Sequence, residues 1–306
     1  MAYKDEPGGI LNRNLLLAVL AFTAAGFCSP SAAQNLTSVE QLYSALPPQA
    51  EIPSPPVPLR AAPSYLSGAA SLSGEKLFQY LHQVTEYPPA GTGTDYLKAK
   101  KYMFSVADNT GCNGAPGVMA FYSQVCVKGE SEHGADYKER GDENGDGIMD
   151  SGGMNAEHSW PQGFFNKAAP MKSDLHHIFP TFIGVNGMRG SEPFGEVSSH
   201  VYATDSGSKL GPEGFEPCDQ VKGDIARAIL YFVVRYYDRK IRDGADYRDF
   251  WTSRVPMFLQ WDRQDPPDEN ERRRNFLIAK FQGNHNPFVD DVTLAGRVSA
   301  KIFQMH

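Results

Sequence analysis

The sequence predicts a mixed α+β fold, mainly helical and organised around a single domain. Its 306 residues are enough to build one large core. The strongest helical pattern covers Asp219–Tyr237, where apolar residues recur at helical spacing and form a wide face. A run rich in β-forming residues, Val118–Val127, predicts a strand. Helices and strands are therefore both expected, in different parts of the chain.

Residues 1–33 have the features of a secretory signal peptide. Arg13 precedes an apolar run that starts at Leu15, and Ser31-Ala32-Ala33 supplies small residues for cleavage. The run has about 13 apolar residues, fewer than the roughly 20 that span a bilayer, so cleavage near Ala33 is favoured over an uncleaved anchor. We expect a secreted or periplasmic protein that does not associate with a membrane.

Residues 34–73 are rich in proline and small residues and predict a disordered leader, so the compact domain is expected at 74–306. Two helices are predicted near the start of this domain, over Glu75–Thr85 and Tyr96–Val106. Towards its end, Glu269–Phe281 predicts another helix.

The mature chain keeps three cysteines, in a compartment that permits disulfides. Cys112 and Cys126 close a short loop, and we expect them to form a bridge worth about 3 kcal/mol. An odd count leaves Cys218 unpaired or available to another chain. The alternative is three buried free thiols.

The net charge of −7 is concentrated in one segment. Residues 130–150 hold eight acids against two bases, a balance of −6, so the remaining mature chain is close to neutral. A groove for a polyanion can therefore still form locally. Its candidate cations are Lys167, Lys172, Arg189, Lys222 and Arg227.

The acidic segment contains a pattern typical of calcium-binding loops. Oxygen donors occupy loop positions 1, 3, 5 and 9, with glycine at position 6. Gly153 stands at position 12, where such loops carry a bidentate glutamate. We expect a structural Ca²⁺, and the alternative is a solvated acidic turn between two strands. The donors are Asp142, Asn144, Asp146 and Asp150.

The stretch from Asn155 to Gly190 carries the chemistry. It places Glu157 beside His158, then the cluster Ser173-Asp174-Leu175-His176-His177, and then Asn186. A carboxylate and an amide carbonyl suit Mg²⁺, which prefers oxygen ligands. The adjacent neutral imidazole is free to accept a proton from water near pH 7. This combination indicates metal-assisted phosphodiester hydrolysis.

The segments EHSWP, MKSDLHHIFP and VNGMRG of this stretch resemble the endonuclease I family of periplasmic and secreted nucleases. Phe215–Tyr237 and Asp265–Asp290 resemble the same family, and the similarity spans roughly Leu77 to Phe303. The resemblance implies a ββα-metal (His-Me finger) motif inserted among helices from both ends of the chain.

The resemblance also implies the roles of the site residues. Glu157 and Asn186 would hold one catalytic Mg²⁺, and His158 would be the general base. The reaction implied is largely sequence-independent cleavage of DNA and RNA that leaves 5′-phosphates. Arg189 could stabilise the phosphate charge, with an ion-paired surface role as the alternative. In family terms Asp174 and His176 would brace the site, while metal-binding, phosphate-donating and buried structural roles stay open for His176 and His177. Lys167 and Lys172, singled out by the charge pattern alone, are the candidates for contacts with nucleic acid.

Local structure at the site follows from general rules. Successive strand residues point to opposite faces, so Glu157 and His158 can share one pocket only if the strand has a bulge or twist. Asn186 is expected on a short helix after Pro180, capped by Thr181.

Three features further along the chain have a structural explanation as an alternative to phosphate binding. Lys222 and Arg227 are candidates for phosphate contacts or for ion pairs within the fold. The Arg272-Arg273-Arg274 run is more typical of a solvated or ion-paired helix face than of a DNA clamp. Asp290 is expected to be structural.

Two rival functions stay open beside the nuclease, which we expect to act as a monomer. One is a secreted ribonuclease with little activity on DNA, since sequence alone does not show how a groove meets the 2′-hydroxyl. The other is a calcium-stabilised, non-catalytic binding module. A zinc hydrolase is disfavoured because the histidines lack His-x-x-x-His spacing.

Overall fold

The computed structural model of the protein describes residues 63–86 and 95–306. The expected signal peptide and most of the expected leader lie outside the described residues. The folded part begins before Gly74, the boundary that composition suggested. A 3₁₀ helix, η1 (Ser64–Ala69), buries Leu66 and Ala69 in the core. Two apolar side chains are enough to pack this short proline-flanked segment, although they form no pattern long enough to detect in the sequence.

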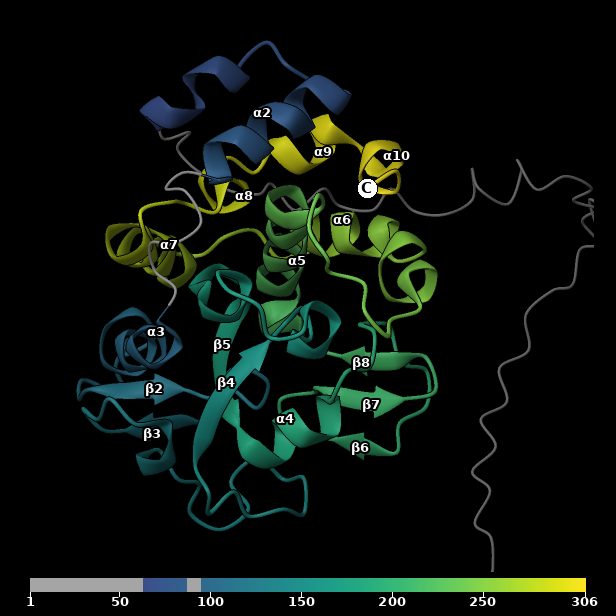
Figure 1. Ribbon diagram of the computed structural model, residues 1–306. Helices are drawn as coiled ribbons and strands as arrows, with labels where there is room; N and C mark the ends of the chain where they lie inside the picture. The colour runs from purple at the N-terminus through teal and green to yellow at the C-terminus, as the bar shows by residue number, and fades with distance from the viewer. Residues whose placement is uncertain (1–62, 87–94) are drawn as a thin grey trace, which may run out of the picture. The chain divides into compact units, whose positions relative to one another are not determined.

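Helix α5 (Lys222–Tyr236) is the centre of the helical part. Nearly all of its side chains are buried, and it packs against α2 (Gly74–Glu86) and α6 (Val255–Gln264). Figure 1 shows α5 between the helices of the C-terminal segment and the strands. Those C-terminal helices are α8 (Pro287–Asp290), α9 (Leu294–Val298) and α10 (Ala300–Phe303). The predicted helix over 219–237 is confirmed, with its first turn in 3₁₀ form as η7 (Asp219–Val221).

The other predicted helices are also present. Helix α3 (Tyr96–Tyr102) begins at Asp95, whose carboxylate accepts two backbone N–H bonds, and continues as the π-helix η2 (Met103–Ala107). Helix α7 (Glu269–Gln282) is capped by Asp268 and ends at Gly283, which has φ of 91°. Shorter turns are η3 (Gly134–Asp136), η4 (Gln162–Phe165), η5 (Met171–Ser173), η6 (Leu175–His177) and η8 (Arg248–Thr252).

The strand predicted over Val118–Val127 is wrong in detail, because the segment is a hairpin. It consists of β2 (Gly117–Met119) and β3 (Cys126–Lys128), paired antiparallel. Between them the chain turns, with Gln124 at φ of 54°. Ala120, Phe121 and Tyr122 of the turn are apolar and buried. In the sequence they therefore continue the apolar run of the two strands. The predicted Cys112–Cys126 disulfide is confirmed, and Cys218 is a buried free thiol.

The remaining strands form two sheets. β4 (Met154–His158) and β5 (Ile178–Phe182) pair antiparallel, and α4 (Ile183–Arg189) follows directly. β6 (Tyr202–Ala203), β7 (Lys209–Gly211) and β8 (Gly214–Glu216) form a small meander. In Figure 1 the β4–β5–α4 unit lies between the β2–β3 hairpin and this meander. None of the helices in the described ranges has the length and apolar character needed to cross a bilayer.

Ion pairs account for Lys222 and Arg227, two of the candidate phosphate contacts. Arg227 is fully buried and contacts three carboxylates, at Asp224, Asp262 and Glu271, which excludes it as a phosphate contact. Lys222 pairs with Glu216 at 2.8 Å.

The arginine run on α7 and Asp290 also have structural contacts. Arg274 pairs with Asp108 at 2.7 Å, as the ion-paired interpretation of the arginine run predicted. Asp290 accepts hydrogen bonds from Tyr65 and Asn275 and is structural, as expected.

Candidate active site

A cleft of about 520 Å³ opens where β4 and α4 meet α3 and the loop after β4. It brings together Glu157, His158, Asn186 and Arg189, four of the residues singled out from the sequence. The lining includes neither of the predicted bracing residues and neither of the predicted nucleic-acid lysines. Tyr96, Lys100 and Asn155 also line the cleft.

Of the bulge or twist expected at Glu157–His158, the bulge is absent. Strand β4 pairs in unbroken register, with Glu157 opposite Phe179 and His158 opposite Ile178. His158 is the last residue of the strand, where the sheet no longer restrains the following chain. Both side chains therefore line the cleft without an extra residue in the ladder.

Glu157 is buried, and both of its protein contacts fall on one oxygen. The Tyr122 hydroxyl donates to Oε1 at 2.9 Å, and Nε of Arg189 lies 3.2 Å from the same atom. Burial raises the pKa of Glu157 to about 6, while Arg189 and the Tyr122 hydrogen bond oppose the rise. Among the hydrogen bonds and ion pairs of the described residues, none reaches Oε2.

Asn186 lies on α4 and is oriented by its neighbour on β4. Its Nδ2 donates to Oδ1 of Asn155 at 2.6 Å, and among the described hydrogen bonds none uses its side-chain oxygen, Oδ1. The predicted Thr181 cap is wrong, because Thr181 lies within β5 and Phe182 holds the cap position without a side-chain bond. The Gly184 amide, in the first turn of α4, instead donates to Asp150.

His158 is oriented by a backbone carbonyl. Its Nε2 lies 3.1 Å from the Lys172 carbonyl oxygen, which can only accept, so Nε2 carries the proton and Nδ1 has a lone pair. Burial, and secondarily the His177 ring 5.5 Å away, lower the pKa of His158 to about 3. The imidazole is therefore neutral at pH 7.

Arg189 is buried rather than on the surface, at 1% exposure. Beside Glu157, it donates to the carbonyls of Ser159 and Gly190 at 2.8 and 2.9 Å and stacks over Phe194. Its charge is largely satisfied by protein groups. A direct role in stabilising phosphate charge stays a prediction.

Asp174 and His176 belong to a buried network behind the cleft. Asp174 accepts bonds from the hydroxyls of Tyr231 and Tyr236, and His176 contacts the Asn284 carbonyl. Burial acts to raise the pKa of Asp174, but Arg235 and the two neighbouring histidines hold it well below its usual range. This network fixes η6, the segment that leads into β5. It is His177, and not His176, whose ring lies next to His158.

Two lysines lie over the ring of Tyr96, which is next to His158. Nζ of Lys100 and Nζ of Lys172 lie 4.9 and 4.8 Å from the centre of this ring, which is itself 5.8 Å from the His158 ring. Lys167, the other predicted lysine, has φ of 55° in a turn outside the cleft lining.

Four residues of the site were missed in the sequence: Tyr96, Lys100, Tyr122 and Asn155. Asn155 could have been found, since strand alternation puts it on the face of Glu157. Tyr96 and Lys100 are four residues apart on one helix, but nothing in the sequence places that helix at the cleft. Tyr122 lies in the hairpin turn and has no sequence signal.

The acidic loop is built partly as the calcium hypothesis requires. Asp142, Asn144 and Asp146 accept bonds from amides within the loop, and Asp150 is buried with Oδ2 unpartnered. The loop does not bring three ligand atoms from His, Cys, Asp or Glu within 4.8 Å of one another. Among the described residues, such a group occurs elsewhere. Calcium binding there stays a prediction. Through Asp150 the loop does hold the first turn of α4.

Comparison with known proteins finds one matching family model and three kinds of relative. A family model described as Endonuclease I matches residues 92–293, more than half of the chain. An extracellular ribonuclease of Bacillus amyloliquefaciens is 35% identical over 154 residues, 45% of this chain and 51% of the relative. A periplasmic deoxyribonuclease of Aeromonas hydrophila is 34% identical over 134 residues, 41% and 49% of the two chains.

The third kind is an Endonuclease-1 of Buchnera aphidicola, 29% identical over 126 residues, 39% of this chain and 45% of the relative. The chain thus spans about half the length of the curated relatives it matches.

Proposed function

Because this chain belongs to the endonuclease I family, we propose that it is an exported, metal-dependent endonuclease for DNA and RNA. The relatives named for their substrate include both a ribonuclease and a deoxyribonuclease, which supports activity on both nucleic acids. Extracellular and periplasmic relatives and the disulfide support export. Cleavage would depend little on sequence, because phosphate contacts carry no sequence information.

The proposal assigns β4, β5 and α4 to a ββα-metal motif. The observation that carries it is the arrangement of Glu157, His158 and Asn186, which the antiparallel pair and the following helix bring to one cleft. Glu157 and Asn186 are each held by a neighbour through one polar atom, and each keeps one oxygen without a partner among the described residues.

The donor atoms fit Mg²⁺. Oε2 of Glu157 and Oδ1 of Asn186 are the atoms that protein contacts leave free, and both are oxygens of the kind Mg²⁺ prefers. Glu157 and Asn186 would hold the ion. When bound, it would neutralise the phosphate charge and stabilise the leaving oxygen.

The chain's own residues supply the remaining functions. His158, with its proton on Nε2, would accept a proton from the attacking water at Nδ1. The Lys172 carbonyl holds the ring in that tautomer. Tyr122 and Arg189 hold Glu157 in place. Arg189 would act mainly by keeping this carboxylate ionised.

Substrate binding is assigned to the cationic cluster at Tyr96. Among the ion pairs formed by the described residues, none includes Lys100 or Lys172, whereas Arg189, the other cation of the cleft lining, pairs with Glu157. Their ammonium groups would contact phosphates on either side of the scissile bond. The face of Tyr96 is a surface on which a base can stack.

The test uses the protein from Gln34 onward, stripped of metal and incubated with supercoiled plasmid or structured RNA. Mg²⁺, Ca²⁺ or chelator is added, beside the variant His158→Ala. Nicking and RNA degradation that need Mg²⁺ and disappear in the variant are expected. Inertness of the wild type with every metal would overturn the nuclease and favour a binding module. Cleavage of RNA alone would make the protein a ribonuclease.

A further inference from the structure

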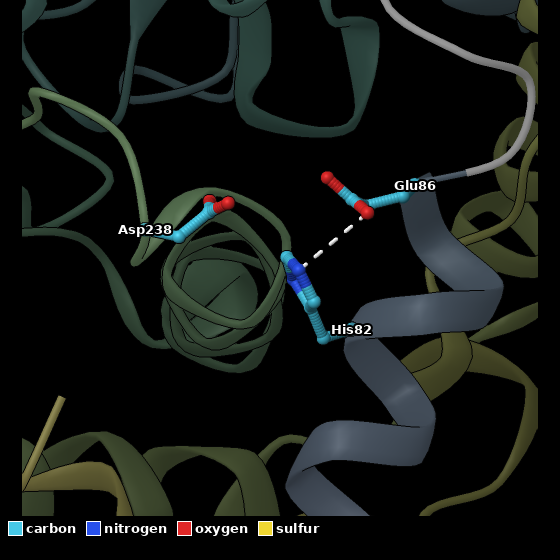
Figure 2. Close-up of side chains that lie close together, drawn as sticks. All are labelled: His82, Glu86 and Asp238. Atoms are coloured by element: carbon cyan, nitrogen blue, oxygen red, sulfur yellow. Dashed lines mark ion pairs between the residues drawn. The ribbon is translucent and has the colours of Figure 1, made fainter.

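A second cluster of ligand-type side chains lies away from the cleft, between α2 and the end of α5. His82 and Glu86 are one helical turn apart on α2, and Asp238 follows α5. Figure 2 shows the three side chains converging across the gap between the two helices. Their ligand atoms all lie within 4.8 Å of one another. None of the three lines the cleft.

His82 is held in one orientation by a buried carbonyl. It is 9% exposed, and its Nδ1 lies 2.8 Å from the Val234 carbonyl oxygen. A carbonyl only accepts, so Nδ1 carries a proton. Metal-binding histidines usually donate their other ring N–H to a carbonyl or carboxylate in this way.

With the proton on Nδ1, the other ring nitrogen of His82, Nε2, is left without one. In the neutral ring, Nε2 presents a lone pair to Oε2 of Glu86, 3.6 Å away. Two acceptors in this arrangement repel each other unless a cation or a proton lies between them. Arg239 does not fill the position, because its Nη2 approaches the other Glu86 oxygen, Oε1, at 3.7 Å.

We propose that His82, Glu86 and Asp238 bind a divalent transition-metal ion, with Zn²⁺ as the best match. An imidazole nitrogen with two carboxylate oxygens suits Zn²⁺, whereas Mg²⁺ favours oxygen ligands alone. Two carboxylates balance the charge of the ion, and partly exposed Glu86 and exposed Asp238 leave it open to water. The ion would link α2 to the end of α5. The two elements are far apart in the sequence, since His82 and Val234 are separated by 152 residues.

This proposal does not depend on nuclease activity, and its test reads binding and stability. Zn²⁺ and, separately, Mg²⁺ are titrated calorimetrically into the metal-free protein from Gln34 onward. Glu157→Gln is present throughout, so that the cleft carboxylate is removed. The midpoint of thermal unfolding is followed under the same conditions. We expect one Zn²⁺ per chain, a raised midpoint, and no matching effect of Mg²⁺.

Three further variants on this background assign the ion. Asp238→Asn changes an exposed side chain and should fold normally, and it should weaken Zn²⁺ binding at least about tenfold, as should His82→Ala. The control is His200→Ala, at an exposed histidine elsewhere, which should leave binding unchanged.

Two outcomes would overturn the site. Equal Zn²⁺ binding in all three variants would mean adsorption at surface histidines. No Zn²⁺ binding, together with a raised pKa of His82 in NMR titration that falls in Glu86→Gln, would mean that a proton occupies the position as an imidazolium–carboxylate pair.

Discussion

Replacing Lys100 by Gln should weaken nucleic-acid binding, whereas replacing Lys98 by Gln should not. The two lysines lie two residues apart on α3, so both changes remove one charge from the same helix. Lys100 lines the cleft, 4.9 Å from the centre of the Tyr96 ring. Lys98 is outside the cleft lining, and its side chain, 77% exposed, lies near Asp95 at 3.6 Å.

The expected magnitude follows from counterion release. One phosphate contact contributes about 0.9 to the slope of log affinity against log salt for duplex DNA, and about 0.7 for single strands. Between 50 and 200 mM salt the concentration rises fourfold. The affinity ratio of wild type to Lys100→Gln should therefore shrink by about 3.5-fold over this range on duplex DNA.

The assay is fluorescence anisotropy of a labelled duplex with Mg²⁺ present, in a His158→Ala background that prevents cleavage. Lys98→Gln is the matched control and should keep the wild-type slope within the error of the measurement. If the two lysine variants have the same slope, the cluster at Tyr96 does not contact phosphate. Failure of the duplex to bind any variant would instead question the nuclease itself.

Three other predictions concern the metal, the disulfide and acid stability. Asn155→Ala should raise the Mg²⁺ concentration for half-maximal plasmid nicking about tenfold, and an unchanged curve would remove its positioning role. Cys126→Ser should lower the free energy of unfolding in guanidinium by about 3 kcal/mol, given the sequence separation of 14. The pKa values of His158, His176 and His177 are lowered from 6.5 to about 3, 4 and 4, chiefly by burial. Below pH 6.5 the unfolded chain then binds more protons than the folded chain. The free energy of unfolding should therefore fall as pH drops from 6.5 to 4, by up to about 1.4 kcal/mol per pH unit for each histidine. A midpoint temperature of thermal unfolding that stays constant over this range would contradict the prediction.

The parts of the fold that could be predicted are those with a long local pattern. Helix α5 could be predicted because its apolar face recurs over four turns, and α7 because Asp268 marks its start. The C-terminal helices α8 to α10 are only one turn or slightly more each, too short for a period to be recognised. The β2–β3 hairpin was read as one strand because tertiary contacts bury its turn, and burial of this kind leaves no mark on local alternation.

The same distinction holds within the site. Glu157, His158 and Asn186 could be predicted because their residue types and spacing carry a family pattern, and the structure brings them to one cleft. Lys100 and Tyr122 could not, because packing alone brings Lys100 on α3 to the cleft and Tyr122 in the β2–β3 turn to Glu157. His176 lies in the buried network, whereas its neighbour His177 is the one beside the general-base candidate, and the bracing role of His176 stays a prediction.

The geometry around Glu157 explains how a buried arginine can lie beside a carboxylate that is proposed to bind a metal ion. Burial alone would protonate the carboxylate, and a protonated Glu157 could not hold a cation. Arg189 and Tyr122 counteract this, and the pKa comes to about 6, below neutral pH. Both contacts fall on Oε1, so the negative charge is kept while Oε2 has no hydrogen bond or ion pair among the described residues. Arg189 and the metal would therefore occupy opposite oxygens of one carboxylate, so the arginine can favour metal binding despite its like charge.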